Sequence, residues 1–290
     1  MNLPLYRLTL ATLLASCGLS AQAADTKPST VFRDCKAACP EMVVVPAGSF
    51  QMGTPDDELG RQDDEGPVHR VTFAKPFAIG RFQVTAGEWN AYLKASGTRI
   101  ADGDERPGRR CTASKPSYPQ GPRQPAVCMS FQDAEDYVAW LSKQTGKHYR
   151  LPSEAEREYA ARAGSTGPFP FAMDPDADYE ISRNANTYGP KDGYSYTSPV
   201  GSYPPNAFGL YDMHGNVYEW VADCWSPNYD GAPDDGSAWT DGLAGGDCKT
   251  RQIRGNDWTE APIFSRSGNR NTRSPDVRGD WLGLRVAREL

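Results

Sequence analysis

Three segments of the chain combine hydrophobic residues at helical spacing with a residue that caps helices. Thr85, Ser130 and Ser153 open these segments. Thr85 and Ser153 are each followed three positions later by a glutamate, which makes a capping box, and Gly146 and Gly164 supply stops for the second and third segments. The sequence therefore predicts three helices that begin at these caps. The side chains expected to face inward are Trp89, Tyr92 and Leu93 in the first helix, and Phe131, Ala134, Tyr137, Val138 and Leu141 in the second.

The remaining pattern is short strands and long loops. A β-branched run at 42–45, a Pro-Ala-Gly turn and an apolar-polar alternation at 50–53 predict a strand, a turn and a second strand. Residues 54–67 are rich in Asp and Glu and are expected to form a solvated loop. Residues 97–125 and 165–205 show no clear period, which predicts loops. No repeat or linker divides the chain, so residues 41–290 are expected to form one domain.

Composition agrees with a loop-rich fold. The chain has 28 glycines and 24 prolines in 290 residues, well above the ~12 % share that these two residues usually hold. A net charge of −6 argues against a nucleic-acid binder, because such proteins need a basic face. The three histidines do not cluster in the sequence, which argues against a multi-histidine metal centre and against a Ser-His-Asp triad.

The first 23 residues read as a secretory signal peptide. They carry Arg7, an apolar stretch too short to span a bilayer, and an Ala-Gln-Ala cleavage site that ends at Ala23. We expect a periplasmic protein without a membrane span, cleaved near Ala23, with a polar leader at 24–40. Cys17 lies in a lipobox-like sequence, and lipidation there is the less favoured alternative.

Removal of the signal leaves six cysteines, and an even number in an exported chain indicates disulfide bonds. Six cysteines allow fifteen connectivities. We favour pairing of nearest neighbours, since each pair closes a short loop; a redox role for the first pair is the less favoured alternative. The expected pairs are Cys35 with Cys39, Cys111 with Cys128, and Cys224 with Cys248.

Six segments in order resemble the formylglycine-generating enzyme family, also called the sulfatase-modifying-factor family. The resemblance covers about residues 41–290 and implies an α+β domain of the C-type-lectin kind with little regular secondary structure. The segments are MVVVPAGSFQMG from 42, RFQVT from 81, RLPSEAE from 150, FGLYDMHGNVYEW from 208, RGNDW from 254 and GLRV from 283.

One departure from the family decides the chemistry. Formylglycine generators carry a cysteine pair that binds copper(I), an ion that prefers soft sulfur ligands. The matching positions in this chain are Glu260 and Ser265. We therefore expect no copper and no formylglycine generation. No Gly-rich phosphate loop is present either, so a nucleotide cofactor is not expected.

The chain resembles most an exported, stand-alone branch of the family that matures the siderophore pyoverdine. This resemblance implies a periplasmic oxidoreductase that converts the chromophore of dihydropyoverdine, a siderophore peptide, to pyoverdine. Dioxygen is the candidate electron acceptor, and other periplasmic maturation enzymes are candidate partners. Tautomerisation after oxidation by another enzyme is an alternative reaction. A non-catalytic exported binding or accessory domain is the alternative from another class.

The candidate active site follows from the same segment. Apolar neighbours should raise the pKa of Glu260 and make it a general acid or base, although a surface salt bridge is the plainer interpretation. Asp257 and Ser265 are candidate secondary proton carriers. Trp258 could stack on a flat substrate or pack in the core. Arg266 and Arg270 could bind anionic substrate groups or line a solvated basic face.

Two oxygen-rich turns match the structural calcium sites of the family. Calcium takes six to eight hard oxygen ligands, and turn capping by the same side chains is the alternative interpretation. The resemblance assigns one site to Asp212, Gly215, Val217 and Glu219. It assigns the other to Asn186, Thr187, Asp192 and Tyr194, with Thr187 and Tyr194 contributing carbonyl oxygens.

Overall fold

The computed structural model describes residues 30–36, 38–106, 109–173, 177–241 and 248–290. The predicted signal peptide, its cleavage site at Ala23, Cys17 and the first part of the leader lie outside the described residues. No helix in the described part of the chain is both long and apolar enough to cross a membrane.

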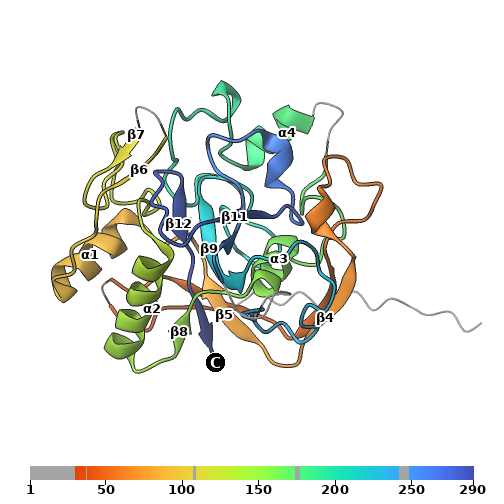
Figure 1. Ribbon diagram of the computed structural model, residues 1–290, viewed down its shortest axis with the longest axis horizontal. Helices are drawn as coiled ribbons and strands as arrows, with labels where there is room; N and C mark the ends of the chain where they lie inside the picture. Colours follow the sequence, from red (N-terminus) through yellow and green to blue (C-terminus); the bar gives the residue numbers. More distant parts are fainter. Residues whose placement is uncertain (1–29, 37, 107–108, 174–176, 242–247) are drawn as a thin grey trace, which may run out of the picture.

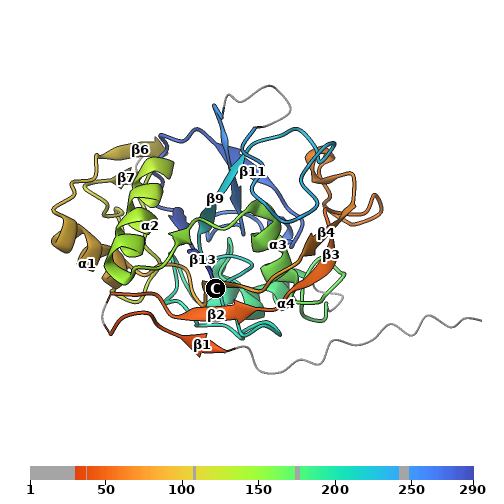
Figure 2. The same ribbon diagram turned by 90° about the horizontal axis from the view of Figure 1, so that it is seen from below.

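A five-stranded sheet brings both ends of the described chain together. Its strands lie in the order β1-β2-β5-β13-β8, and all neighbours are antiparallel. The predicted strand at 42–45 is confirmed as β2, and the leader contributes the edge strand β1 (Figure 2). The bounds are Val31–Phe32 for β1, Met42–Val45 for β2, Phe77–Gly80 for β5, Tyr149–Arg150 for β8 and Ala287–Glu289 for β13.

A four-stranded sheet carries the candidate site. Its order is β11-β10-β9-β12, with β12 parallel to β9 and the other neighbours antiparallel. Strand β9 lies near the centre of the molecule (Figure 1). The bounds are Tyr218–Cys224 for β9, Arg251–Arg254 for β10, Asn271–Arg273 for β11 and Leu282–Leu284 for β12.

Two further strand pairs lie outside these sheets. The predicted strand at 50–53 is confirmed as β3 (Gly48–Met52), but it pairs with β4 (His69–Phe73) and not with β2. A second pair, β6 (Gly103–Arg106) with β7 (Arg109–Cys111), lies in the segment predicted to be loop.

Three helices begin at the predicted caps. They are α1 (Ala86–Ser96), α2 (Phe131–Thr145) and α3 (Glu154–Arg162), and each opens with a complete capping box. All the side chains predicted to face inward are buried except Leu93, which is half-buried. Helix α3 ends at Arg162, and its C-cap is Ala163, one residue before the predicted stop, in the left-handed region at φ 45°.

One helix was not predicted. Helix α4 (Ala177–Asn184) lies in the stretch from 165 to 205 that was expected to be loop. The short 3₁₀ helices are η1 (Asp63–Glu65), η2 (Pro190–Asp192) and η3 (Pro262–Ser265).

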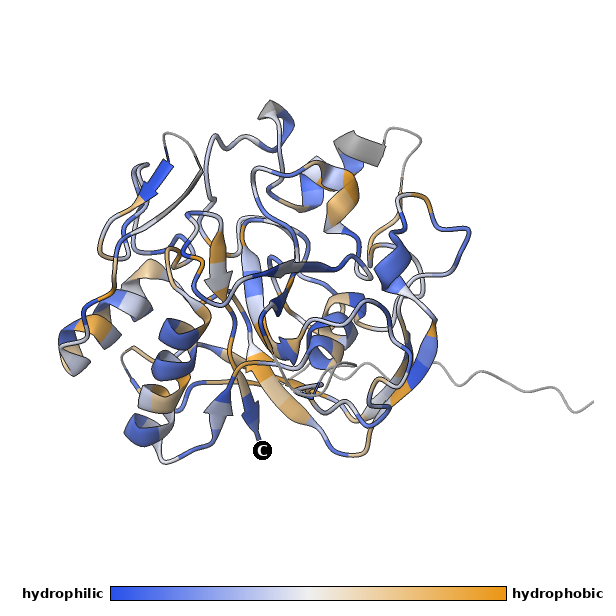
Figure 3. Ribbon diagram, viewed as in Figure 1, coloured by the Kyte–Doolittle hydropathy of each residue, from blue (hydrophilic) through white to orange (hydrophobic). Residues whose placement is uncertain are grey.

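The core contains ion pairs as well as apolar side chains. All nine residues of α3 are buried, although five of them are Glu or Arg. Its charges are matched from other elements: Arg157 pairs with Glu219 at 2.6 Å, and Glu158 pairs with Arg254 at 2.6 Å. In Figure 3 the hydrophobic colour is strong on β5 near the centre, whereas α3 carries hydrophilic colour inside the molecule.

The three expected disulfide bonds are all present. Cys35 is bonded to Cys39, Cys111 to Cys128 and Cys224 to Cys248. These six cysteines are consequently all oxidised, which leaves none of them as a thiolate for metal binding or nucleophilic attack.

Candidate active site

The segment after β10 forms a loop that two internal contacts close. Asn256 is buried, adopts a left-handed φ of 68° and donates from Nδ2 to Ser265 Oγ at 2.7 Å. His214 donates from Nδ1 to the carbonyl oxygen of Ser265 at 2.8 Å. Burial lowers the pKa of His214 to about 4, so this imidazole is neutral at physiological pH. Loop residues 257–264 are therefore held between two buried polar anchors.

Glu260 lies in this loop and is half-buried. Its backbone nitrogen donates to Asp257 O at 3.4 Å, and its carbonyl accepts from the nitrogen of Tyr188 at 2.9 Å. Glu260 therefore lies in the expected loop and is partly covered by its surroundings.

A second carboxyl and a phenol lie beside Glu260. Asp257 is fully buried, and its Oδ1 accepts from the nitrogen of Thr259. The phenol is Tyr218, at the start of β9, which accepts from Asn271 Nδ2 at 3.1 Å. Burial raises the pKa of Tyr218, and the negative charges of Asp257 and Glu260 raise it further. Two carboxyl groups thus act electrostatically on a buried phenol that stays protonated.

Trp258 forms one wall of this region. Its side chain is half-buried, its Nε1 donates to the carbonyl oxygen of Asp280 at 3.4 Å, and the guanidinium of Arg109 lies 4.3 Å from the centre of its ring. One ring face of Trp258 is therefore covered by a cation.

Ser265 has a structural role in this arrangement. It is almost fully buried, with Oγ bonded to Asn256 and its carbonyl bonded to His214. These contacts place it under the loop, and the prediction that it carries protons finds no support in the geometry.

The structure corrects the prediction that Arg266 and Arg270 bind substrate. Arg266 is buried and pairs with Glu58 at 2.9 Å and Glu65 at 2.7 Å, so the acidic loop at 54–67 is fastened to the core through buried Glu65 instead of being fully solvated. Arg270 is also buried and pairs with Glu154 at 2.8 Å. Both guanidinium groups already have internal carboxylate partners, which leaves them structural.

The first expected calcium site is a cradle of oxygen atoms around the Gln83 amide. Gln83 Nε2 lies 3.0 Å from Val217 O, 3.0 Å from Glu219 Oε1, 3.2 Å from Gly215 O and 3.4 Å from Asp212 O. An amide nitrogen has two hydrogens and cannot satisfy four acceptors. Gln83 Oε1 and Asp212 Oδ1 are buried and find no hydrogen-bond partner among the described residues. These two unpaired oxygens fit a calcium ion, whereas Glu219 already pairs with the buried guanidinium groups of Arg157 and Arg285.

The second expected site is built around Asp192. Its carboxylate accepts from the backbone nitrogens of Thr187 and Tyr194, each at 2.9 Å. Asn186 Oδ1 is buried and has no hydrogen-bond partner within the described part of the chain. Each Asp192 oxygen retains a lone pair, so these residues also fit a hard cation. No three His, Cys, Asp or Glu side chains gather into a metal cluster in the described ranges, so either site would depend on carbonyl and amide oxygens.

Sequence reasoning missed several residues of the site. Tyr218 and Asn271 come from different strands, and only the pairing of β10 with both β9 and β11 brings them beside Asp257. Gln83 lies just before α1, more than a hundred residues from the turn that it contacts. The motif around Tyr218 marked its neighbourhood as important, but its spacing did not indicate which side chains converge.

Comparisons with known proteins show the family of the chain. Residues 27–290 match the sulfatase-modifying factor enzyme 1-like domain. The chain therefore belongs to the FGE-sulfatase family, in which the formylglycine-generating enzymes are also found. Within solved structures it is similar to PvdO from Pseudomonas aeruginosa, with 70% sequence identity and a TM-score of 0.87 over 91% of this chain and 99% of that one.

Curated relatives include both active and inactive members. The formylglycine-generating enzyme of Thermomonospora curvata is 32% identical, over 65% of this chain and 73% of its own length. The inactive C-alpha-formylglycine-generating enzyme 2 of Bos taurus is 34% identical, over 85% and 87%. Treponema denticola variable protein 1, at 23% identity and a TM-score of 0.66, shares the fold.

Proposed function

We propose that this protein is a periplasmic enzyme of siderophore maturation that oxidises the chromophore of dihydropyoverdine to pyoverdine, with Glu260 as acid and base. The high identity to PvdO over nearly the whole of both chains supports a role in pyoverdine maturation. The three disulfides support an exported location, because such bonds persist in oxidising compartments.

The observation that carries the reaction is the half-buried Glu260 beside Asp257 and Tyr218. Oxidation removes two hydrogens from the dihydro ring. Glu260 takes one as a proton, and the second hydrogen passes with the electron pair to dioxygen. The hydroperoxide anion that results takes the proton back from Glu260, which gives hydrogen peroxide and restores the carboxylate. Tyr218 and Asp257 are both too deeply buried to reach substrate directly, which leaves them to set the electrostatic surroundings of Glu260.

Formylglycine generation is not supported by the donor set. Glu260 and Ser265 occupy the positions of the copper-binding cysteine pair in the resemblance, and carboxylate and hydroxyl oxygens are poor ligands for copper(I). The six cysteines of the described chain are held in disulfides. Calcium at the two oxygen-rich turns would be structural, held by Gln83, Asp212, Val217 and Glu219 in one site and by Asn186 and Asp192 in the other.

The test replaces Glu260 in the producing strain. Glu260→Gln keeps the shape of the side chain and removes its acid–base function, so conversion should fall about 100-fold or more. Glu289→Gln, at a side chain that is 64% exposed, is the matched control and should convert normally. The readouts are the absorbance and the mass of the siderophore in the culture supernatant.

The outcomes separate the reactions. If the Glu260→Gln strain accumulates a siderophore that is two hydrogens heavier than pyoverdine, the missing step is an oxidation. If its siderophore has an altered absorbance but the mass of pyoverdine, the missing step is a tautomerisation. Normal conversion by both Glu260→Gln and Glu260→Ala would eliminate the acid–base role and favour a binding or accessory domain. Unchanged siderophore fluorescence after deletion of the gene would contradict a role in pyoverdine maturation.

A further inference from the structure

Two exposed tyrosines lie at the edge of the candidate active site. Tyr188 is 68% exposed and Tyr196 is 44% exposed. The backbone of Tyr188 is bonded to Glu260 at 2.9 Å, and the ring of Tyr196 lies 5.4 Å from the ring of Trp258. Exposed aromatic groups clustered on a surface often mark a binding site. Their position beside Glu260 indicates that the ligand would be the substrate.

Three rings form a fixed aromatic corner. Tyr196 stacks on Tyr118 with centroids 4.8 Å apart and planes 12° apart, and Trp258 meets both rings at steep angles of 75° and 85°. Tyr118 is buried and donates its hydroxyl hydrogen to the carbonyl oxygen of Asp280 at 2.7 Å. The inner ring is thus anchored, whereas Tyr196 presents the exposed ring.

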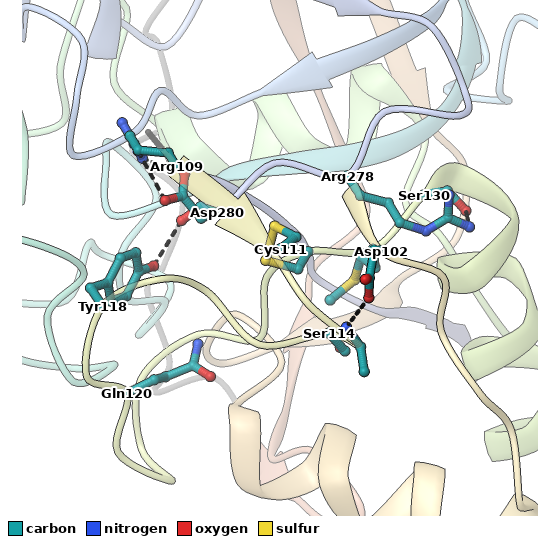
Figure 4. The surroundings of a disulfide bond; sticks show 12 residues. Asp102, Arg109, Cys111, Ser114, Tyr118, Gln120, Ser130, Arg278 and Asp280 are labelled. Atoms are coloured by element: carbon teal, nitrogen blue, oxygen red, sulfur yellow. Dashed lines mark hydrogen bonds and ion pairs between the residues drawn. A yellow bond between two sulfur atoms is a disulfide. The ribbon is translucent and has the colours of Figure 1, made fainter. Parts of the chain in front are cut away.

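A cation borders the corner. The guanidinium of Arg109 lies over Trp258, and its Nε donates to Asp280 Oδ2 at 2.9 Å. Figure 4 shows Arg109 and Tyr118 both directed at Asp280, close to the disulfide of Cys111. The buried Asp280 therefore positions Arg109 through its carboxylate, and it positions the rings of Tyr118 and Trp258 through its carbonyl oxygen. The Asp280 carboxylate occupies Nε and Nη2 of Arg109, but this side chain remains about a quarter exposed, unlike those of Arg266 and Arg270.

We propose that Tyr196, Trp258 and Arg109 form the ring-binding part of the substrate site, which takes a flat aromatic ring with adjacent hydroxyl groups. The ring packs against Tyr196 and the edge of Trp258, and Arg109 faces its oxygen atoms, whose partial or full negative charge matches the guanidinium. This inference rests on the proposed function, because Trp258 lies two residues before Glu260 in the same loop.

The test measures binding and not turnover. 6,7-Dihydroxyquinoline is titrated into the purified mature protein by calorimetry, with trans-1,2-cyclohexanediol as a ligand that has neighbouring hydroxyl groups and no aromatic face. 6,7-Dihydroxyquinoline should bind and trans-1,2-cyclohexanediol should not. Tyr196→Ala should weaken quinoline binding about fivefold or more, and Tyr196→Phe, which keeps the ring, should bind as the native chain does.

Trp225→Ala is the matched control. Trp225 is 38% exposed and lies just after β9, outside the corner, so its loss should leave quinoline binding unchanged. Equal binding by Tyr196→Ala and the native chain would overturn the proposal, as would equal binding of the two ligands. Thermal melting of each variant confirms that it is folded.

Failure of this inference can be distinguished from failure of the proposed function. If Glu260→Gln stops conversion while Tyr196→Ala binds the quinoline normally, the ring site is wrong and the enzyme assignment stands. If Tyr196→Ala loses binding while Glu260→Gln converts normally, the ring site stands and the acid–base role is wrong.

Discussion

At the scale of single residues, buried charged side chains are paired with one another inside the molecule. Arg270 and Arg254 both pair with Glu154 at 2.8 Å, and all three side chains are at most 4% exposed. A buried ion pair gains little over a well-packed apolar pair, but removal of one partner leaves an uncompensated charge. These residues therefore specify the fold without being available to ligands.

We predict that Glu154→Ala lowers the free energy of unfolding by about 3–5 kcal/mol, because it leaves Arg270 without its carboxylate. Urea unfolding of the purified protein measures the change. Glu289→Gln, at an exposed pair with His148, should change it by less than about 0.5 kcal/mol. Equal small effects for the two variants would contradict the prediction.

A second prediction concerns Asp223, which accepts from the backbone nitrogens of Glu154 at 2.7 Å and Trp239 at 2.8 Å. Burial, together with the charge of Glu154, raises the pKa of Asp223 to about 7, from an ordinary value of ~4 in an unfolded chain. Between these values the folded protein keeps a proton that the unfolded chain releases. The contribution of Asp223 to stability therefore falls as pH rises from about 4 to 7 and is constant above.

The comparison with Asp223→Asn isolates this effect. The difference in unfolding free energy between the native chain and the variant should be larger at pH 5 than at pH 8, as measured by urea titration. Glu154 and Glu219 have a lowered pKa. Their contribution to the free energy of unfolding therefore rises with pH, but only below the ordinary glutamate pKa of ~4.3. A difference that stays constant across this range would show that Asp223 titrates normally.

At the scale of elements, helix starts were predictable and strand partners were not. The caps Thr85, Ser130 and Ser153 act through atoms a few residues away, so local sequence contains the whole signal. The pairing of β3 with β4 depends on a loop between them and not on either strand alone. Helix α3 was found by its cap, but its total burial was not foreseen because its charges are matched from distant strands.

In the candidate site, too, features set by local sequence were predictable and features set by distant partners were not. The motif placed Glu260 and Asp257 correctly in one loop, since they are close in sequence. It could not show that Arg266 and Arg270, a few residues further on, turn inward to meet Glu65 and Glu154. Local spacing predicts a segment, whereas the direction of a long side chain depends on partners from elsewhere in the fold.

A prediction at this scale concerns the hairpin β6–β7. Its disulfide joins cysteines 17 positions apart, and its loss through Cys111→Ser with Cys128→Ser should cost about 3 kcal/mol of unfolding free energy. Binding of 6,7-dihydroxyquinoline should also weaken, because Arg109 precedes Cys111 by two residues.

The matched control is the double variant Cys35→Ser with Cys39→Ser. This pair closes a separation of four, so its loss should cost roughly 1 kcal/mol less and leave quinoline binding intact. If removal of the hairpin disulfide leaves binding unchanged, Arg109 is held in place by Asp280 alone.

At the scale of the whole molecule, little of the chain lies in long regular elements, and polar turns must be held by other means. Buried oxygens at Gln83, Asp212 and Asn186 lack hydrogen-bond partners in the described residues. Such atoms are costly inside a protein unless something satisfies them. Structural calcium would satisfy them and join the turns to the core.

We predict that the melting temperature of the purified protein falls by about 5–10 °C when EGTA removes calcium. A ligand present at a hundred times its Kd stabilises by about 2.7 kcal/mol, and each kcal/mol moves the melting temperature of a chain this size by about 2–4 °C. Added calcium should restore the native value, and magnesium should not. Identical melting curves with and without EGTA would exclude structural calcium.

The disulfide beneath Arg109 has a consequence for when the protein becomes competent. Before export, in a reducing cytoplasm, Cys111 and Cys128 would remain thiols and the hairpin would lack its covalent tether. In a newly made chain Arg109 would then be held less firmly, and the ring-binding site would bind catechol-like metabolites of the cytoplasm only weakly. If the chain is exported as we propose, oxidation of this pair after translocation would complete the ring-binding site only outside the cytoplasm.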